Sequence, residues 1–112
     1  MASFQFGTPA ATPSAASASS LVLRAAPGAV DFISITTGTT AGYLMLHNLT
    51  AAPSNGAVTP VLPSWQVPAN TTVMVGFDPP LQMTTGAVLT FSSTGPTTQT
   101  LSATAMLGGR IT

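Results

Sequence analysis

The sequence predicts an all-β fold, an antiparallel β-sandwich of about seven strands that follows an extended N-terminal arm. Three observations predict it. From residue 21 onward, short runs of β-branched, aromatic and other apolar residues are separated by clusters of Gly, Pro, Asn and Asp. The apolar spacing of an amphipathic helix is not sustained anywhere along the chain. The runs recur roughly every 8 to 12 residues, which is typical of sandwiches and small barrels.

Residues 1–20 form the predicted arm, and residues 21–112 form the predicted sandwich domain. Between Thr8 and Ser20, every residue other than two prolines is Ala, Ser or Thr, a composition that discourages a stable helix and offers little to pack. The segment also lacks the charged and apolar regions of a secretory signal. Phe4 and Phe6 point the same way along an extended chain, so they either anchor the arm in a neighbour's groove or fold back on their own domain.

The first three strands are expected at residues 20–24, 31–36 and 42–48. The first two are short runs of Leu, Val, Ile and Phe bounded by Gly, Pro or Thr. The third contains Tyr43, Leu44, Met45 and Leu46, and is therefore apolar on both faces. This pattern predicts a central strand, covered on one side by the second sheet and on the other by a loop or a partner.

The fourth and fifth strands are expected at residues 61–67 and 71–77. Prolines lie on both sides of Trp65, which favours an edge position because proline cannot donate to a sheet ladder. In the fifth strand Val73, Val75 and Phe77 share one face. The following Asp78-Pro79-Pro80 is expected to end it.

The last two strands are expected at residues 87–93 and 100–107, and they alternate most clearly. Ala87, Leu89 and Phe91 share one face of the sixth strand, which predicts that Phe91 lies in the core. Thr94-Gly95-Pro96 is expected to end this strand. In the seventh, the shared face holds Leu101, Ala103, Ala105 and Leu107, and Gly108-Gly109 is expected to form a bend before the C-terminus.

Charged residues make up only 4% of the 112 residues, and the net charge is zero. Because charge repulsion is one of the forces that keep copies apart, this composition favours an assembly component over a free monomer. Two arginines balanced by two aspartates cannot supply a basic footprint for nucleic acid. No apolar run approaches the roughly 18 residues of a membrane span. We therefore expect neither nucleic acid nor a membrane as a partner.

The sequence predicts no catalytic, metal-binding or cofactor-binding residues. His47 with Asp31 or Asp78 is the only conceivable acid–base dyad, and no nucleophile or phosphate-binding motif accompanies it. The chain has no cysteine and too few other ligands for a zinc site. Tyr43 and Trp65 are the aromatic residues with a polar group, so they are candidate interaction residues, although Trp65 also fits a role as core cover.

Four stretches carry a resemblance to a known family: 41–46 (AGYLML), 51–60 (AAPSNGAVTP), 80–86 (PLQMTTG) and 89–96 (LTFSSTGP). In these stretches the chain resembles a family of small structural proteins of tailed bacteriophages, and the similarity spans about residues 34–107. Its members accompany virion structural genes, and the resemblance therefore implies a particle component. The layout is also similar to that of decoration or cement proteins, which pair a compact β domain with an N-terminal arm.

We therefore expect a non-enzymatic virion protein on the capsid surface that binds the major capsid protein or another virion protein. It is expected to form a homo-oligomer, with a trimer favoured, and its arm is expected to grip a neighbouring subunit. A component of the tail, neck, baseplate or fibre is an alternative within the same class. A host-surface adhesin that binds carbohydrate through Trp65 and Tyr43 is an alternative from a different class.

Overall fold

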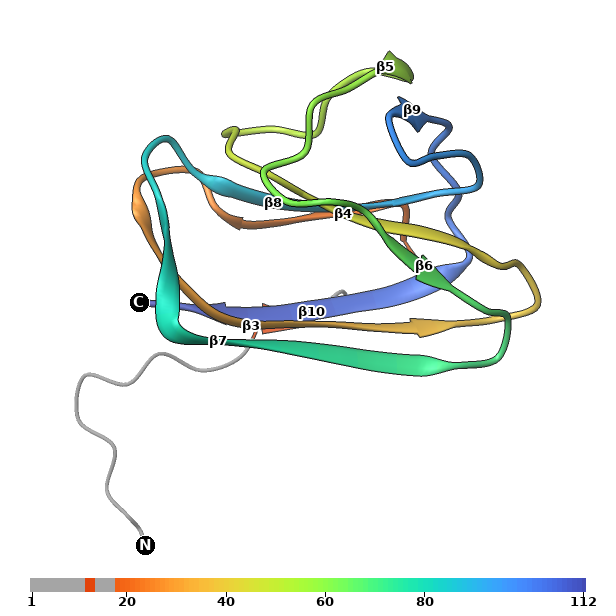
Figure 1. The fold of residues 1–112 in the computed structure, drawn as a ribbon, viewed down its shortest axis with the longest axis horizontal. Helices are drawn as coiled ribbons and strands as arrows, with labels where there is room; N and C mark the ends of the chain where they lie inside the picture. Colours follow the sequence, from red (N-terminus) through yellow and green to blue (C-terminus); the bar gives the residue numbers. More distant parts are fainter. Residues whose placement is uncertain (1–11, 14–17) are drawn as a thin grey trace, which may run out of the picture.

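The structure is a computed structural model that describes residues 12–13 and 18–112, and it confirms the predicted all-β, antiparallel architecture. Two four-stranded sheets lie one above the other (Figure 1). In sheet order, sheet A consists of β1 (Thr12–Pro13), β10 (Ala105–Ile111), β3 (Gly28–Thr37) and β7 (Thr72–Met83). Sheet B consists of β2 (Ser20–Arg24), β8 (Ala87–Ser92), β4 (Gly42–His47) and β6 (Trp65–Val67). A short pair joins β5 (Gly56–Ala57) to β9 (Thr98–Gln99). Within these residues no helix has the length and hydropathy to cross a membrane.

One hydrophobic core fills the space between the two sheets. Alternate residues of β3 and β10 point into it from sheet A, and alternate residues of β4 and β8 point into it from sheet B. Phe91 is 0% exposed in this cluster, which confirms the predicted core face of β8. The largest contributors are Ile33, Ile35, Leu44, Leu46, Leu89, Phe91 and Leu107. Burial of these side chains is the main force that holds the sheets together.

The prediction for the third strand is also confirmed, because β4 is an inner strand of sheet B between β8 and β6. Leu44 and Leu46 face the core, whereas Met45 and His47 are buried on the opposite side. Both faces of β4 are thus covered, which explains why the strand is apolar on both.

The prediction that Asp78-Pro79-Pro80 ends the fifth strand is wrong, since β7 continues to Met83. The pairing with β3 shifts between Val30 and Phe32, which pair with Leu81 and Gly76, so residues 77–80 form a wide bulge opposite Asp31. The two prolines lie in this bulge on an edge strand, where no ladder donor is required of them.

The prediction of a bend at Gly108-Gly109 is wrong as well, since both glycines lie inside β10. Gly109 faces sheet B at a point of close approach: a Cβ there would lie 2.9 Å from the Phe32 carbonyl oxygen and 3.0 Å from Leu23 Cδ1. The glycine makes room for Leu23 and does not break the strand.

Further strand boundaries differ from expectation, and the second strand begins at Gly28 in place of residue 31. The fourth strand begins only at Trp65, although its edge position is confirmed. The seventh was expected over residues 100–107, but the chain forms β9 at Thr98–Gln99, then a single bridge from Leu101 to Ser92, and then β10 from Ala105. Residues 102–104 connect the two sheets. Their sequence alternates, which extended the predicted strand, but they belong to no strand.

Parts of the predicted arm are described, and they pair with their own domain. Thr12 and Pro13 pair with Gly109 and Gly108 of β10. The Ala18 N–H donates to Ala105 O of sheet A at 2.7 Å, and Ser19 O accepts from the Phe91 N–H of sheet B at 2.9 Å. Residues 18–20 therefore carry the chain from one sheet to the other. Phe4 and Phe6 lie outside the described residues.

Candidate interaction surfaces

The outer face of sheet A is an exposed surface with almost no charge. Ile33 and Ile35 of β3 fill the core, so Phe32, Ser34 and Thr36 point away from it. Residues that pair across a sheet share a face, and the registers therefore place the β10 and β7 partners of these three on the same side. We call this set the sheet A outer face: Phe32, Ser34, Thr36, Met106, Gly108, Arg110, Thr72, Met74 and Gly76.

Two methionines dominate the exposed apolar area of this face. Met74 is 67% exposed and Met106 is 47% exposed, although both lie within regular strands. The cation on this face is neutralised locally, because Arg110 Nε lies 3.0 Å from Asp31 Oδ2. The Arg110 guanidinium also lies over the Phe32 ring, 5.7 Å from its centroid. The sheet A outer face therefore carries almost no net charge. It exposes apolar side chains that no other described part of the chain covers.

The outer face of sheet B is covered by the chain itself. Residues 48–64 and 93–101, which we call the loop cover, include β5 and β9 and lie over β4 and β8 (Figure 1). The loop cover is fastened by polar contacts: Gln99 Nε2 donates to Pro53 O at 2.9 Å, Asn55 Oδ1 accepts from the Leu101 N–H at 2.9 Å, and the Val61 N–H donates to Leu46 O at 2.8 Å. Five side chains of sheet B are buried beneath it, Met45, His47, Val88, Thr90 and Ser92, and Gln99 of the loop cover is buried as well.

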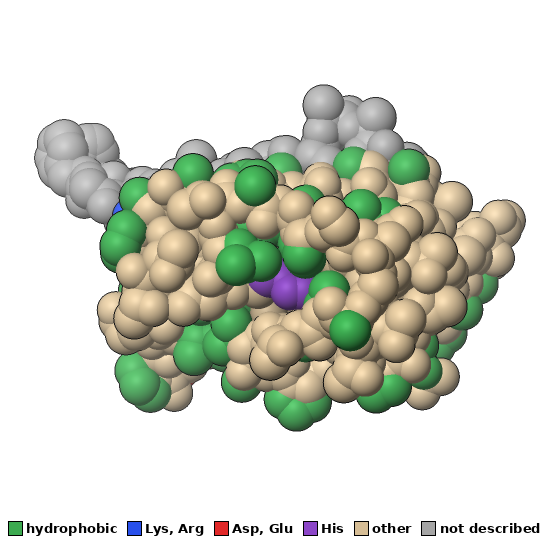
Figure 2. All heavy atoms as spheres, turned by 90° about the horizontal axis from the view of Figure 1, so that it is seen from above, with side chains coloured by type: hydrophobic (Ala, Val, Ile, Leu, Met, Phe, Trp, Pro, Cys, Tyr) green, Lys and Arg blue, Asp and Glu red, His purple; other side chains and the backbone are tan. Residues whose placement is uncertain are grey.

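His47 lies at the bottom of a hollow in the loop cover (Figure 2). Its side chain is only 1% exposed, and Nε2 is hydrogen-bonded to Thr90 Oγ1 at 2.9 Å. A cavity of about 410 Å³ lies elsewhere on this sheet, whereas the hollow above His47 encloses about 310 Å³ and is lined mainly by apolar residues of the loop cover. His47 is therefore the floor of a small, largely apolar depression.

Burial lowers the pKa of His47 from 6.5, and an interaction with the Gln99 side chain acts weakly in the opposite direction. Gln99 Oε1 is itself buried and has no hydrogen-bond partner among the described residues. Burial therefore favours the neutral form of the ring over the protonated form.

The structure does not assemble the one acid–base dyad that the sequence allowed. His47 faces away from the core on sheet B, whereas Asp31 and Asp78 both belong to sheet A. Asp31 is engaged by Arg110, and Asp78 lies in the exposed bulge of β7. Among the described residues, no group of three or more His, Cys, Asp or Glu side chains is positioned to hold a metal ion.

Tyr43 and Trp65 lie on opposite faces of sheet B. Trp65 pairs with Leu44 and packs against the hydrophobic core, whereas Tyr43 is the neighbour of Leu44 along the strand and points outward. A single aromatic platform made of both rings does not exist in this arrangement.

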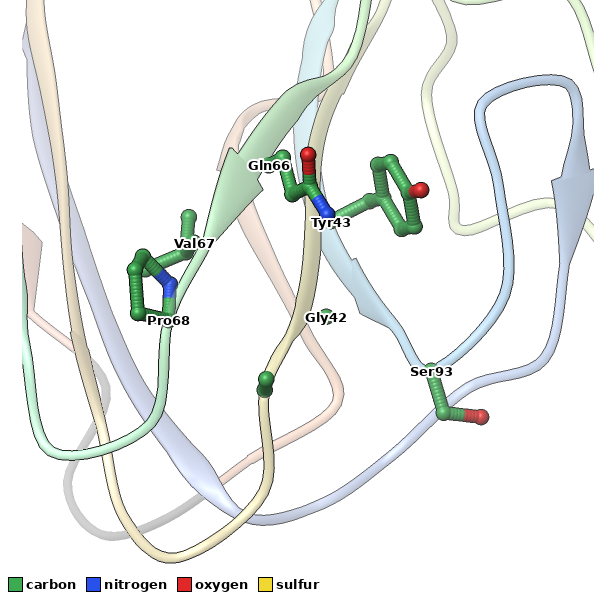
Figure 3. Close-up of a pocket in the computed structure, with 7 residues that line it drawn as sticks. Gly42, Tyr43, Gln66, Val67, Pro68 and Ser93 are labelled. Atoms are coloured by element: carbon green, nitrogen blue, oxygen red, sulfur yellow. The ribbon is translucent and has the colours of Figure 1, made fainter.

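Tyr43 instead contributes to a groove at the end of sheet B, with a volume of about 410 Å³. Gln66 pairs with Tyr43 across β4 and β6, and its side chain extends toward β4 (Figure 3). The ring is packed against Gly95, where a Cβ would lie 2.6 Å from Tyr43 Cγ. The groove thus joins an aromatic ring to an amide, a feature that the sequence did not indicate because Gln66 lies far from Tyr43 along the chain.

Sequence reasoning also missed the importance of Met74 and Met106. The signal was present for Met74, since it alternates with Val73 and Val75 and must point away from the core if they point toward it.

No family model, curated protein or solved structure matches the chain.

Proposed function

We propose that the chain is a non-enzymatic structural protein of a bacteriophage virion, a β-sandwich that decorates and cements the outside of the capsid as a homo-oligomer. The sheet A outer face carries this proposal. It exposes Met74 and Met106 on regular strands and compensates Arg110 within the face, so another protein surface can cover it without burying an unpaired charge.

The resemblance of residues 34–107 to small virion proteins of tailed phages supports the choice of particle. The composition supports it too, because a chain with 4% charged residues has little repulsion between copies. In this proposal, residues 1–11 reach an adjacent subunit, while residues 12–13 and 18–20 belong to the folded domain through their pairing with β10 and β8.

Quantitative mass spectrometry of purified phage particles tests the proposal. A decoration protein is expected in a number of copies comparable with that of the major capsid protein. A few copies per particle would favour the tail, neck, baseplate or fibre alternative, and absence from particles would overturn the virion assignment.

Deletion of residues 1–11 tests the role of the arm. The truncated protein is expected to keep the circular dichroism spectrum and unfolding transition of the full chain but to lose its binding to particles. A variant with residues 1–11 replaced by Gly and Ser in equal length separates the contribution of the sequence from that of the length. Full occupancy by either variant would show that the arm does not grip the particle.

The groove at Tyr43 favours one second candidate, a carbohydrate-binding adhesin. Its ring can stack on a sugar and the Gln66 amide can hydrogen-bond to hydroxyl groups. A glycan array would test it: binding that is lost in Tyr43→Ala and Gln66→Ala, but kept in Gln82→Ala on sheet A, would support adhesion. No binding by the full chain would exclude this candidate.

A further inference from the structure

The first half of β7 has backbone groups that no described segment pairs with, so they are available to another strand. The Thr37 N–H donates to Thr71 O at 2.9 Å, so residue 71 directs its backbone groups toward β3. Backbone direction alternates along a strand, and therefore Val73 and Val75 also face β3. Thr72, Met74 and Gly76 direct their N–H and C=O groups outward, and no other described segment forms a backbone hydrogen bond with them.

This half of the edge also lacks the features that normally prevent strand pairing. Thr72–Phe77 contains no charged residue and no proline. The second half differs, because Asp78, Pro79 and Pro80 form a bulge there. The other edge strands are shorter or irregular: β1 has two residues, β6 has three, and β2 has a register shift between Val22 and Arg24. Among the described edges, β7 is therefore the one suited to pairing over several residues.

We propose that residues 72–76 pair antiparallel with the same segment of a second copy of this chain, about a two-fold axis at Met74. This proposal rests on the proposed function, since it identifies the contact through which the assembling protein binds itself. Met74 then lies opposite Met74 of the partner copy, and Thr72 lies opposite Gly76 of the partner copy. Each of these pairs exchanges two backbone hydrogen bonds, and a continuous eight-stranded sheet results.

Two features of this edge favour a second copy of the chain as its partner. A two-fold axis at Met74 uses all three outward-facing residues, whereas an axis at Val73 would leave Gly76 facing residue 70, outside β7. The segment also carries no charge, so two identical copies meet without like-charge repulsion, and a partner that recognises charge finds nothing to bind. The Met74 side chains, 67% exposed in the single chain, cover each other across the axis. A two-fold contact gives a dimer in place of the trimer expected from the sequence.

Cysteine cross-linking tests the register directly, because the chain has no cysteine of its own. Cα atoms of a hydrogen-bonded antiparallel pair lie about 5.5 Å apart, within the range that a disulfide spans. Met74→Cys should therefore give a disulfide-linked dimer under mild oxidation. The matched control Thr72→Cys should not, because the two copies of residue 72 are offset by four positions, about 13 Å along the strands. Equal cross-linking of both variants, or of neither, would overturn the proposal.

Sedimentation velocity tests the same contact without oxidation. Met74→Lys should shift the monomer–dimer equilibrium about tenfold or more toward monomer, because two ammonium groups would face each other across the axis. Met106→Lys is the matched control, since it adds the same charge to the same face on an inner strand, and it should leave the equilibrium within about twofold. Circular dichroism confirms that both variants fold.

Other occupants of the β7 edge give different results. If residues 1–11 of another copy filled it, their deletion would abolish self-association and Met74→Cys would not cross-link, which would overturn the two-fold pairing. A full chain that stays monomeric at high concentration would overturn it as well. Failure of the proposed function is distinguishable, because absence from particles can accompany an intact Met74 dimer, and presence in particles can accompany a monomer.

Discussion

The two sheets share one core, but they differ in what lies on their other side. Sheet B is covered by residues of its own chain, so that every residue of β8 is buried and His47 is almost completely enclosed. Sheet A leaves Met74 and Met106 exposed on its outer face and leaves the edge of β7 without a described neighbour. The chain thus covers the outer face of sheet B by itself. On sheet A, we expect a partner to cover the outer face and the edge.

The largest effect should come from the core that both sheets share. Phe91→Ala removes a fully buried ring and should lower the free energy of unfolding by about 3–5 kcal/mol. Equilibrium urea unfolding measures it, with Met74→Ala as the control on the exposed side, where a change within about 0.5 kcal/mol is expected. A loss well below 1 kcal/mol at Phe91 would mean that the ring does not fill the space between the sheets.

A smaller effect should come from the attachment of the loop cover. Gln99→Ala removes a side chain that is 1% exposed and the donor that its Nε2 supplies to the half-buried Pro53 carbonyl, which should cost about 1–3 kcal/mol. Amide hydrogen exchange should show the loss concentrated at residues 53–61 and 98–101. The control Gln66→Ala changes an exposed glutamine on β6 and should leave both measurements nearly unchanged. Loss of protection spread evenly over sheet A would contradict a separate role for the loop cover.

The pH dependence of stability probes the same covered face. The pKa of His47 is lowered in the folded chain, so below 6.5 the unfolded chain binds more protons than the folded chain does. Stability should therefore fall as the pH decreases from 6.5 toward the folded pKa, by at most about 1.4 kcal/mol per pH unit. Unfolding curves measured between neutral and mildly acidic pH check this.

His47→Gln serves as the control for that titration, because it retains a polar group near Thr90 but cannot titrate. The variant should lose this part of the pH dependence. An unchanged pH profile in the variant would show that His47 does not supply the effect.

The smallest effect on stability is expected on the sheet A outer face. Met74→Ser and Met106→Ser each remove exposed apolar area and should change the free energy of unfolding of the monomer by no more than about 0.5 kcal/mol. Self-association measured by sedimentation should nevertheless weaken in Met74→Ser and much less in Met106→Ser. Equal behaviour of the two variants would remove the distinction between the edge and the middle of this face.

The parts of the fold that the sequence predicted are those determined by neighbours along the chain. Alternation alone placed Phe91 in the core, and the two apolar faces of β4 indicated that both would be covered. The parts that could not be predicted depend on distant residues. Pro79 is compatible with a strand only because β7 is an edge, and Gly109 continues β10 because Leu23 of the other sheet approaches it.

The same distinction holds for the candidate surfaces. Tyr43 and Trp65 were named from their chemistry, but whether they share a face depends on the pairing of β4 with β6. Gln99 gave no signal in the sequence, because its role comes from contacts with Pro53 and with the surroundings of His47. Met74 could be placed outside the core by alternation, yet its significance followed only when β7 was seen to be an edge.

The crossing at residues 18–20 has a mechanical consequence. The Ala18 N–H donates a hydrogen bond to Ala105 O of sheet A, and Ser19 O accepts one from the Phe91 N–H of sheet B. Two consecutive residues are thus attached to different sheets. A tensile load applied through the N-terminus meets the pairing of β1 with β10 first, and it then reaches both sheets within two consecutive residues.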